Sequence, residues 1–222
     1  MTYELIIFDL DNTLYDGDSG LLQELGRRIR IWLQTHLNLE DAAAQALQHE
    51  YHRLYGTTMG GLIVEHPDLD IHDYLQFVHD IPVEDYLQPD QALAQMLVSL
   101  PLRKIVYTNA TSEYGWRVLA ALDVQTYFER VVGIEEVELR NKIYSDAYGR
   151  MLDLVGVEPD RCIMVEDWVS NLQAAKALGM VTVLVGEEPA EHVDFCAPDI
   201  LQVGRIVKSL LDGAEQPGDC SS

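Results

Sequence analysis

The sequence has no long run of apolar residues and few basic ones. Hydrophobic residues make up 48% of its 222 positions, yet no apolar stretch approaches the roughly eighteen residues that a membrane-spanning helix needs. Lys and Arg number 15 against 37 Asp and Glu, so the formal net charge is −22. Nucleic-acid binding relies on clustered cations, and this field repels polyanions. We therefore expect neither nucleic acid nor a membrane as a partner.

Cysteine is also scarce. The three cysteines, Cys162, Cys196 and Cys220, are too few and too scattered for a disulfide framework or a zinc site. Cys162 lies in an apolar run, and we interpret it as a core thiol. The N-terminus has no basic segment before its short apolar run, so we expect no signal peptide and a cytoplasmic protein.

Short apolar runs recur along the chain and alternate with amphipathic segments. The runs are rich in β-branched residues and do not alternate with polar ones, which is typical of strands buried on both faces of a parallel sheet. The alternation predicts an α/β fold with a doubly wound, Rossmann-like parallel sheet. The predicted strands are Leu5–Phe8, Lys104–Tyr107, Arg130–Val132, Cys162–Val165 and Val181–Val185.

A long helical interval separates the first predicted strand from the second. Apolar residues three to four apart, such as Leu22, Leu25 and Ile29, indicate helices there. The interval is too long for one crossover helix, so we expect an inserted all-helical cap over residues 16–85. The catalytic core then comprises residues 1–15 and 86–211, and the Gly-, Pro- and Ser-rich tail 212–222 is expected to be disordered.

Acidic pairs follow two of the predicted strands. Asp9 and Asp11 follow the first, and Glu166 and Asp167 follow a later one. The carboxyl ends of parallel strands open onto a common ligand crevice. Four converging acids would repel one another without a cation, and oxygen ligands of this kind suit Mg²⁺. Taken alone, either pair could be a turn or a helix cap.

Two weaker signals lie between these acidic pairs. Thr108 and Asn109 follow the second predicted strand, where a hydroxyl and an amide could hold phosphoryl oxygens. Lys142 stands in an otherwise acidic region. By themselves, the Thr-Asn pair is also typical of a turn, and a lone Lys is also typical of a solvated surface.

The order of these motifs resembles the haloacid dehalogenase superfamily of phosphatases, over nearly the whole chain. The resemblance implies that Asp9 is the nucleophile and Asp11 the general acid and base. It further implies that Thr108, Asn109 and Lys142 hold the phosphate. Mg²⁺ would be held by Asp9, Asp11 (through its backbone carbonyl) and Asp167, with Glu166 beside them. Asp11 argues against dehalogenation, because the dehalogenase branch lacks this second carboxylate.

The cap residues resemble the pyrimidine 5'-nucleotidase branch of that superfamily. The resemblance is carried by Ser19–Leu21, Tyr55–Leu62 and Tyr74–His79. It implies a nucleoside 5'-monophosphate as substrate, with Tyr55, Thr57 and Thr58 facing it. Alternatively, the threonines cap the next helix. The chain departs from the branch at Ile143, where Pro is usual, and at Trp168, where a small residue is usual.

Several alternatives remain open at this point. The same scaffold would serve a sugar-phosphate phosphatase or a phosphomutase, although the cap has no evident cluster of basic residues for a second phosphate. A non-catalytic phospho-acceptor also places acids and a Lys around Mg²⁺, but such domains lack a large insertion. The expected partner is a small phosphorylated metabolite, and the expected state is a monomer or homodimer.

Overall fold

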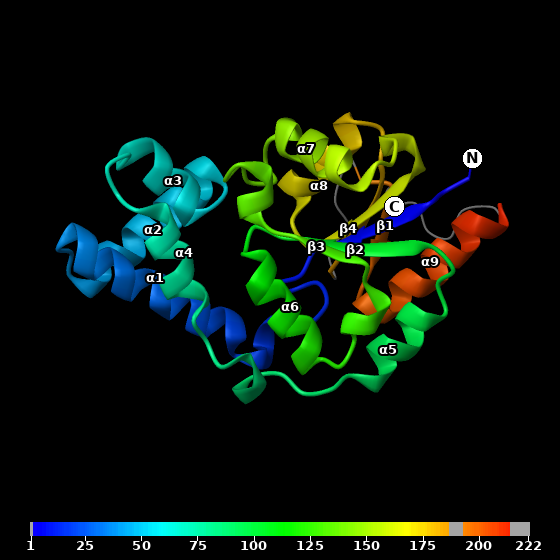
Figure 1. The fold of residues 1–222 in the computed structure, drawn as a ribbon, viewed down its shortest axis with the longest axis horizontal. Helices are drawn as coiled ribbons and strands as arrows, with labels where there is room; N and C mark the ends of the chain where they lie inside the picture. The colour runs from blue at the N-terminus through cyan, green and yellow to red at the C-terminus, as the bar shows by residue number, and fades with distance from the viewer. Residues whose placement is uncertain (1, 187–192, 214–222) are drawn as a thin grey trace.

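A six-stranded parallel sheet forms the centre of the molecule (Figure 1). The computed structural model describes residues 2–186 and 193–213. Within them the strand order is β3-β2-β1-β4-β5-β6, and every neighbouring pair is parallel. The strands are β1 (Leu5–Phe8), β2 (Arg103–Tyr107), β3 (Arg130–Val132), β4 (Cys162–Glu166), β5 (Val181–Val185) and β6 (Phe195–Ala197).

Helices cover both faces of the sheet, which explains why its strands are apolar throughout. In Figure 1, α7 and α8 lie above the sheet, and α5, α6 and α9 lie below it. Every residue of β1 and β4 is buried. The covering helices are α5 (Gln91–Val98), α6 (Ser112–Ala121), α7 (Ser145–Val155), α8 (Val169–Ala177) and α9 (Ile200–Asp212).

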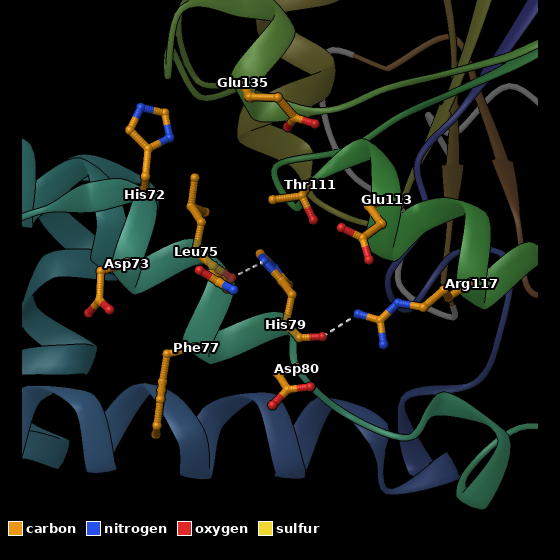
Figure 2. A pocket seen from close by; sticks show the side chains of 11 residues that line it. His72, Asp73, Leu75, Phe77, His79, Asp80, Thr111, Glu113, Arg117 and Glu135 are labelled. Atoms are coloured by element: carbon orange, nitrogen blue, oxygen red, sulfur yellow. Dashed lines mark hydrogen bonds between the residues drawn. The ribbon is translucent and has the colours of Figure 1, made fainter.

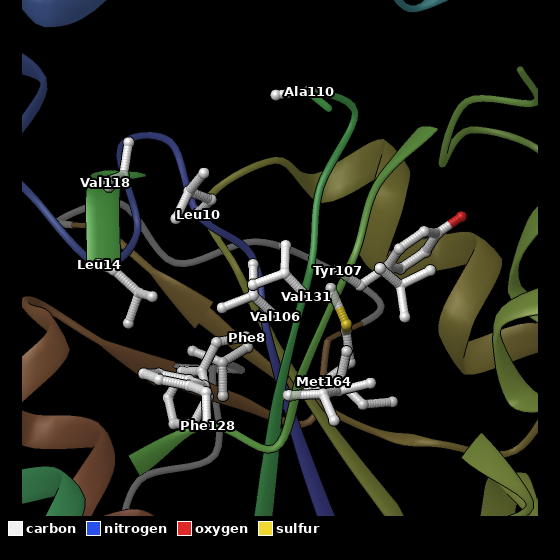
Figure 3. Close-up of a cluster of buried hydrophobic side chains, with 14 of the residues drawn as sticks. Phe8, Leu10, Leu14, Val106, Tyr107, Ala110, Val118, Phe128, Val131 and Met164 are labelled. Atoms are coloured by element: carbon white, nitrogen blue, oxygen red, sulfur yellow. The ribbon is translucent and has the colours of Figure 1, made fainter. Parts of the chain in front are cut away.

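The core under the site is built from the strands and α6 (Figure 3). Phe8 of β1 meets Phe128 edge to face, with ring centroids 5.8 Å apart. Leu10 and Leu14 continue the buried apolar surface beyond the end of β1. This packing fixes the segment that carries the first acidic pair. Cys162 is fully buried and free, which confirms its interpretation as a core thiol.

Helices α1–α4 form a separate group beside the sheet, at the left of Figure 1. Trp32 is buried between α1 and α4, and its indole N–H donates to Asp73 at 2.9 Å. Asp70 caps α4 and Thr57 caps α3. The bounds are α1 (Leu21–Leu37), α2 (Asp41–Tyr55), α3 (Thr58–Glu65) and α4 (Ile71–His79).

The predicted fold class is confirmed: an α/β parallel sheet with helices inserted between its first two strands. All four inserted helices fall inside 16–85, and the exact bounds of cap and core stay a prediction. The tail prediction lies outside the described residues from position 214 onward. Its first residue, Asp212, instead ends α9. Trp116 of α6 is 37% exposed.

Three features were not predicted from the sequence. These are helix α3, which contains two glycines, strand β6, which has only three residues, and helix α9, which follows a segment without a clear strand pattern in its sequence. Within the described residues, no helix has both the length and the apolar character needed to cross a membrane.

Candidate active site

The two acidic pairs meet at the carboxyl edge of the sheet, between β1 and β4. Phe8 pairs with Val165 in register, and the Asp9 N–H donates to the Val165 carbonyl at 2.9 Å. This is where the strand order turns from one side of β1 to the other, and such points open a crevice in parallel sheets. The fold therefore brings Asp9 beside Glu166 and Asp167.

Lys142 is buried between two of these carboxylates. Its side chain is 1% exposed, and its ammonium contacts Asp9 and lies 2.9 Å from Glu166 Oε2. Burial opposes the charge on Lys142, but Asp9 and Glu166 together hold its pKa above the usual range. The alternative that Lys142 is a solvated surface residue is wrong, because its charge is partnered inside the protein.

The buried acids carry shifted pKa values of their own. Burial raises the pKa of Asp9, and Lys142 acts against that rise. Burial also raises the pKa of Glu166, with the neighbouring Asp9 adding to it. An ionised Asp9 therefore depends on cations placed next to it, of which Lys142 is one.

Three carboxylates at this edge could hold a metal ion. One oxygen from each of Asp9, Glu166 and Asp167 lies within 4.8 Å of the others. Oxygen-only donors of this kind fit Mg²⁺, which also keeps several waters. Asn12 donates to Asp167 at 2.7 Å and fixes its orientation. The side chain of Asp11 is not part of this group.

Asp11 turns instead toward two tyrosines and the cap. The hydroxyls of Tyr15 and Tyr114 both donate to Asp11 Oδ1. Burial, with the charge of Asp9 as the next cause, raises the pKa of Asp11 to about 7. A carboxyl group with such a pKa can both give and take a proton near neutral pH. Its side chain suits acid–base chemistry rather than metal binding.

Thr108 and Asn109 follow β2 and face the same edge. Thr108 is fully buried, and its hydroxyl oxygen accepts from the Ala110 N–H at 3.0 Å. That bond does not use the hydrogen of the Thr108 hydroxyl. Asn109 Oδ1 accepts from the Lys142 N–H at 3.0 Å, so this amide positions the lysine loop.

A pocket of about 380 Å³ opens between Asp11 and the cap helices. Thr57 and Thr58 both line it, together with Asn109 and Ala110 of the core. Thr57 Oγ1 also accepts from Gly60 N–H at 2.9 Å, as expected of a helix cap. Tyr55, predicted beside it, lies outside the lining because its hydroxyl donates to Glu65.

Asn141 is a residue that sequence reasoning missed. Its amide group donates to the Tyr55 carbonyl at 2.7 Å and to Thr57 Oγ1 at 3.3 Å. It thus joins the loop that carries Lys142 to the turn between α2 and α3. The only signal in the sequence is its position next to Lys142, which does not indicate a contact with the cap.

A larger cavity of about 800 Å³ lies on the other side of α4 (Figure 2). None of the predicted site residues lines it. In Figure 2, Arg117 of α6 reaches the end of α4 and donates to the His79 carbonyl. It also donates to the Ile81 carbonyl at 2.9 Å. This cavity shares Leu75 and His79 with the pocket beside Asp11, so α4 separates the two.

The family is decided by a sequence match. The family model of haloacid dehalogenase-like hydrolases matches residues 3–179. The chain belongs to this family. The match includes Asp9, Lys142 and Asp167, the residues on which the resemblance was based.

Curated relatives of this hydrolase are distant in sequence. A phosphoglycolate phosphatase of Shigella boydii is 24% identical over 223 residues, covering 88% of this chain and 87% of that protein. Phosphate metabolism protein 8 of Saccharomyces cerevisiae is 26% identical over 136 residues, 58% of this chain. The matched part spans only 42% of the yeast protein's length. A phosphoglycolate phosphatase of Escherichia coli K12 is 31% identical over 104 residues, covering 46% of this chain and 40% of that protein.

Solved structures share the fold. A haloacid dehalogenase-superfamily phosphatase of Thermococcus onnurineus superposes with a TM-score of 0.62 at 18% identity. The superposition covers 96% of this hydrolase and 100% of that chain. The L-2-haloacid dehalogenase of Xanthobacter autotrophicus gives 0.59 at 19% identity, covering 94% and 100%. At such identities the similarity shows the fold alone. The resemblance to the pyrimidine 5'-nucleotidase branch stays a prediction.

Proposed function

We propose that this hydrolase is a Mg²⁺-dependent phosphomonoesterase that works through a phosphorylated Asp9. The observation that carries the proposal is the buried Asp9–Lys142–Glu166 cluster, with Asp11 directly beside it at the pocket. A nucleophile, a fixed cation and an acid–base group are then within one small site. These are the groups that an acyl-phosphate mechanism requires.

The reaction proceeds in two displacements. A carboxylate oxygen of Asp9 attacks phosphorus in line, and the bond from phosphorus to the leaving oxygen breaks as Asp11 gives that oxygen a proton. Asp11 then takes a proton from a water that attacks the phosphoryl group on Asp9, which releases phosphate and regenerates the carboxylate. Lys142 and the Thr108 hydroxyl stabilise the charge on the phosphoryl oxygens throughout.

Asp9 and Asp167 would hold the Mg²⁺, with the backbone carbonyl of Asp11 and Glu166 nearby. When bound, the ion supplies positive charge against the phosphoryl oxygens. Glu166 already accepts from Lys142 and from the Trp168 N–H at 3.3 Å. We therefore assign Glu166 chiefly to positioning Lys142 and assign direct ligation to the two aspartates.

Two classes of leaving group are compatible with this proposal. A nucleoside 5'-monophosphate is supported by the resemblance of the cap residues, including Thr57 and Thr58. A sugar phosphate or phosphoglycolate is favoured by the names of the curated relatives, which include phosphoglycolate phosphatases and a fructose-1-phosphate phosphatase. Both possibilities use the same catalytic residues.

The test is phosphate release from nucleoside monophosphates, sugar phosphates and phosphoglycolate, with Mg²⁺ and with a chelator. The expected result is multiple turnover that the chelator abolishes, with phosphate trapped on Asp9 after acid quenching. One phosphate retained per chain without turnover would instead identify a phospho-acceptor. No phosphorylation of any kind would overturn the proposal.

A further inference from the structure

The side chains that line the pocket beside Asp11 determine which leaving groups it can accommodate. Helix α1 contributes Leu22, Leu25 and Ile29, and α4 contributes Leu75 and Val78. Helix α2 contributes side chains that can form hydrogen bonds, such as the amide of Gln48. The pocket is therefore apolar along α1, mixed along α4, where Tyr74 and His79 also line it, and polar along α2.

Charge within this pocket is almost entirely negative or neutral. Asp11 is its one carboxylate, and no Lys or Arg side chain lines it among the described residues. Three histidines line it, His49, His52 and His79, and burial lowers the pKa of the last two, that of His79 to about 4. Both are therefore neutral at pH 7 and offer no positive charge.

The arginines of α1 are occupied elsewhere. Arg28 donates to the Phe77 carbonyl at 2.7 Å, and Arg30 lies 3.8 Å from Asp41. Arg30 is close to the pocket, since its guanidinium lies 3.7 Å from the place that a Cβ on Gly26 would take. Its side chain is nevertheless not among those that line the pocket.

From these walls we infer that the pocket takes an uncharged leaving group with hydroxyl groups and an apolar face, and that it rejects a carboxylate. This inference rests on the proposed phosphomonoesterase function and names its substrate class. A carboxylate in the pocket would lose its hydration against apolar walls, and no Lys or Arg among the described lining residues would compensate for that loss. The phosphate group of the substrate is accommodated differently, because the buried cation Lys142 lies at its binding site.

Two matched pairs of substrates test the inference on the full-length protein with Mg²⁺. Within each pair, only the carboxylate differs: 2-hydroxyethyl phosphate against phosphoglycolate, and glycerol 3-phosphate against 3-phosphoglycerate. We expect kcat/KM to favour the neutral member of each pair by at least about tenfold.

The variant Gln48→Lys places a cation in the pocket wall. It should reduce the ratio of kcat/KM for the neutral substrate to kcat/KM for the carboxylate substrate by about tenfold in each pair, chiefly by raising kcat/KM for the carboxylates. The matched control Gln48→Met has a similar length and no charge, so it should keep the wild-type ratio.

Equal or greater kcat/KM for the carboxylates in the wild type would overturn the inference and leave the phosphatase proposal intact. If Arg30→Met then removed that preference, Arg30 would be the carboxylate-binding cation. Absence of hydrolysis with both pairs and with nucleotides and sugar phosphates would overturn the proposed function itself. The two failures are thus distinguishable.

Discussion

At the scale of single residues, the buried cation Lys142 organises the site. Its ammonium is shared by Asp9 and Glu166, whose side chains are themselves 8% and 2% exposed. Removing one member of a buried ion cluster leaves charge without a partner, which costs more than an exposed ion pair contributes. Lys142 therefore matters for stability as well as for chemistry.

The variant Lys142→Met should lower the free energy of unfolding by about 3 kcal/mol or more. Urea unfolding without Mg²⁺ measures this, and adding Glu166→Gln should recover part of the loss by removing one unpaired carboxylate. Lys176→Met is the control, because the Lys176–Asp194 pair is 40% and 33% exposed and should lose only about 1 kcal/mol or less. Equal losses in the two lysine variants would contradict this account.

The variant Asp9→Asn should reduce phosphate release by about a thousandfold or more while keeping the fold, because the amide cannot attack phosphorus. Steady-state kinetics and circular dichroism check the two parts. Asn remains close in shape and leaves Lys142 paired with Glu166. Phosphate release near the wild-type rate would refute the mechanism.

Residues that follow a buried strand could be predicted from the sequence, and those that depend on cap contacts could not. Asp9, Thr108 and Asp167 each come directly after a strand, where chain position fixes their place. Asn141 lies in a loop and Tyr55 at the last position of α2, where contacts are set by how the cap packs on the core. Tyr55 was accordingly predicted in the pocket, whereas its hydroxyl is bound to Glu65.

At the scale of elements, the turn between α2 and α3 joins the cap to the lysine loop. Gly56 ends α2 with a φ of 77°, and a Cβ there would lie 2.6 Å from Ile143 Cγ2. Ile143 stands where the nucleotidase branch usually has Pro, and in this chain it packs directly against the turn. Gly156 ends α7 with a similar φ of 67° and has open space around it.

These two glycines form a matched pair for measuring the contact. Gly156→Ala should cost about 1 kcal/mol of stability from backbone strain alone. Gly56→Ala should lower the free energy of unfolding by more than Gly156→Ala does, and it should also lower kcat/KM, because the turn must move away from Ile143. Thermal unfolding and kinetics of both variants test this. Adding Ile143→Ala to Gly56→Ala should restore part of the loss, and equal costs at the two glycines would exclude a cap–core contact here.

Helix α4 ends in a buried histidine that makes stability depend on pH. His79 donates from Nδ1 to the Leu75 carbonyl at 2.9 Å, and burial lowers its pKa from 6.5 to about 4. The unfolded chain binds this proton below about pH 6.5 while the folded chain does not, so stability falls as the pH decreases from about 6.5 toward 4.

The variant His79→Gln lacks this titration. The difference in the free energy of unfolding between the wild type and this variant should therefore become about 2 kcal/mol smaller as the pH is lowered from about 7.5 to about 5.0. Urea unfolding of both proteins at several pH values measures the difference. A constant difference across the range would show that His79 is protonated in the folded protein too.

At the scale of the whole molecule, the net charge of −22 acts on stability and on ion binding together. Self-repulsion of this size is screened by any salt, so stability should rise with NaCl. A specific Mg²⁺ effect must therefore be measured at equal ionic strength.

At equal ionic strength, Mg²⁺ at about a hundred times its Kd should raise the free energy of unfolding by about 2.7 kcal/mol. Calorimetry with and without chelator measures this. The variant Asp167→Asn should lose most of the increment, because it removes one metal ligand and keeps the overall charge nearly unchanged. An equal increment from NaCl alone, or in Asp167→Asn, would contradict a defined site.

The overall architecture was largely predictable because buried strands carry a strong apolar signal. The exceptions had physical reasons. Strand β6 is too short for a pattern, and α3 contains glycines that weaken helix propensity. Gly61 is needed there because a Cβ would lie 2.2 Å from the Tyr51 ring, so tertiary packing forms this helix.

The insertion of the cap after β1 also has a consequence for biosynthesis. Asn12 and Asp167 are hydrogen-bonded although 155 residues separate them in the chain. A ribosome adding about 5–20 residues per second needs about 8–30 s to make that interval. During this time the emerging chain exposes Asp9 and Asp11 without the lysine, the second acidic pair or the strand that orders them. The active site of the newly made protein is therefore completed late, when β4 adds to the sheet. The cap helices can fold before that point, because they emerge earlier.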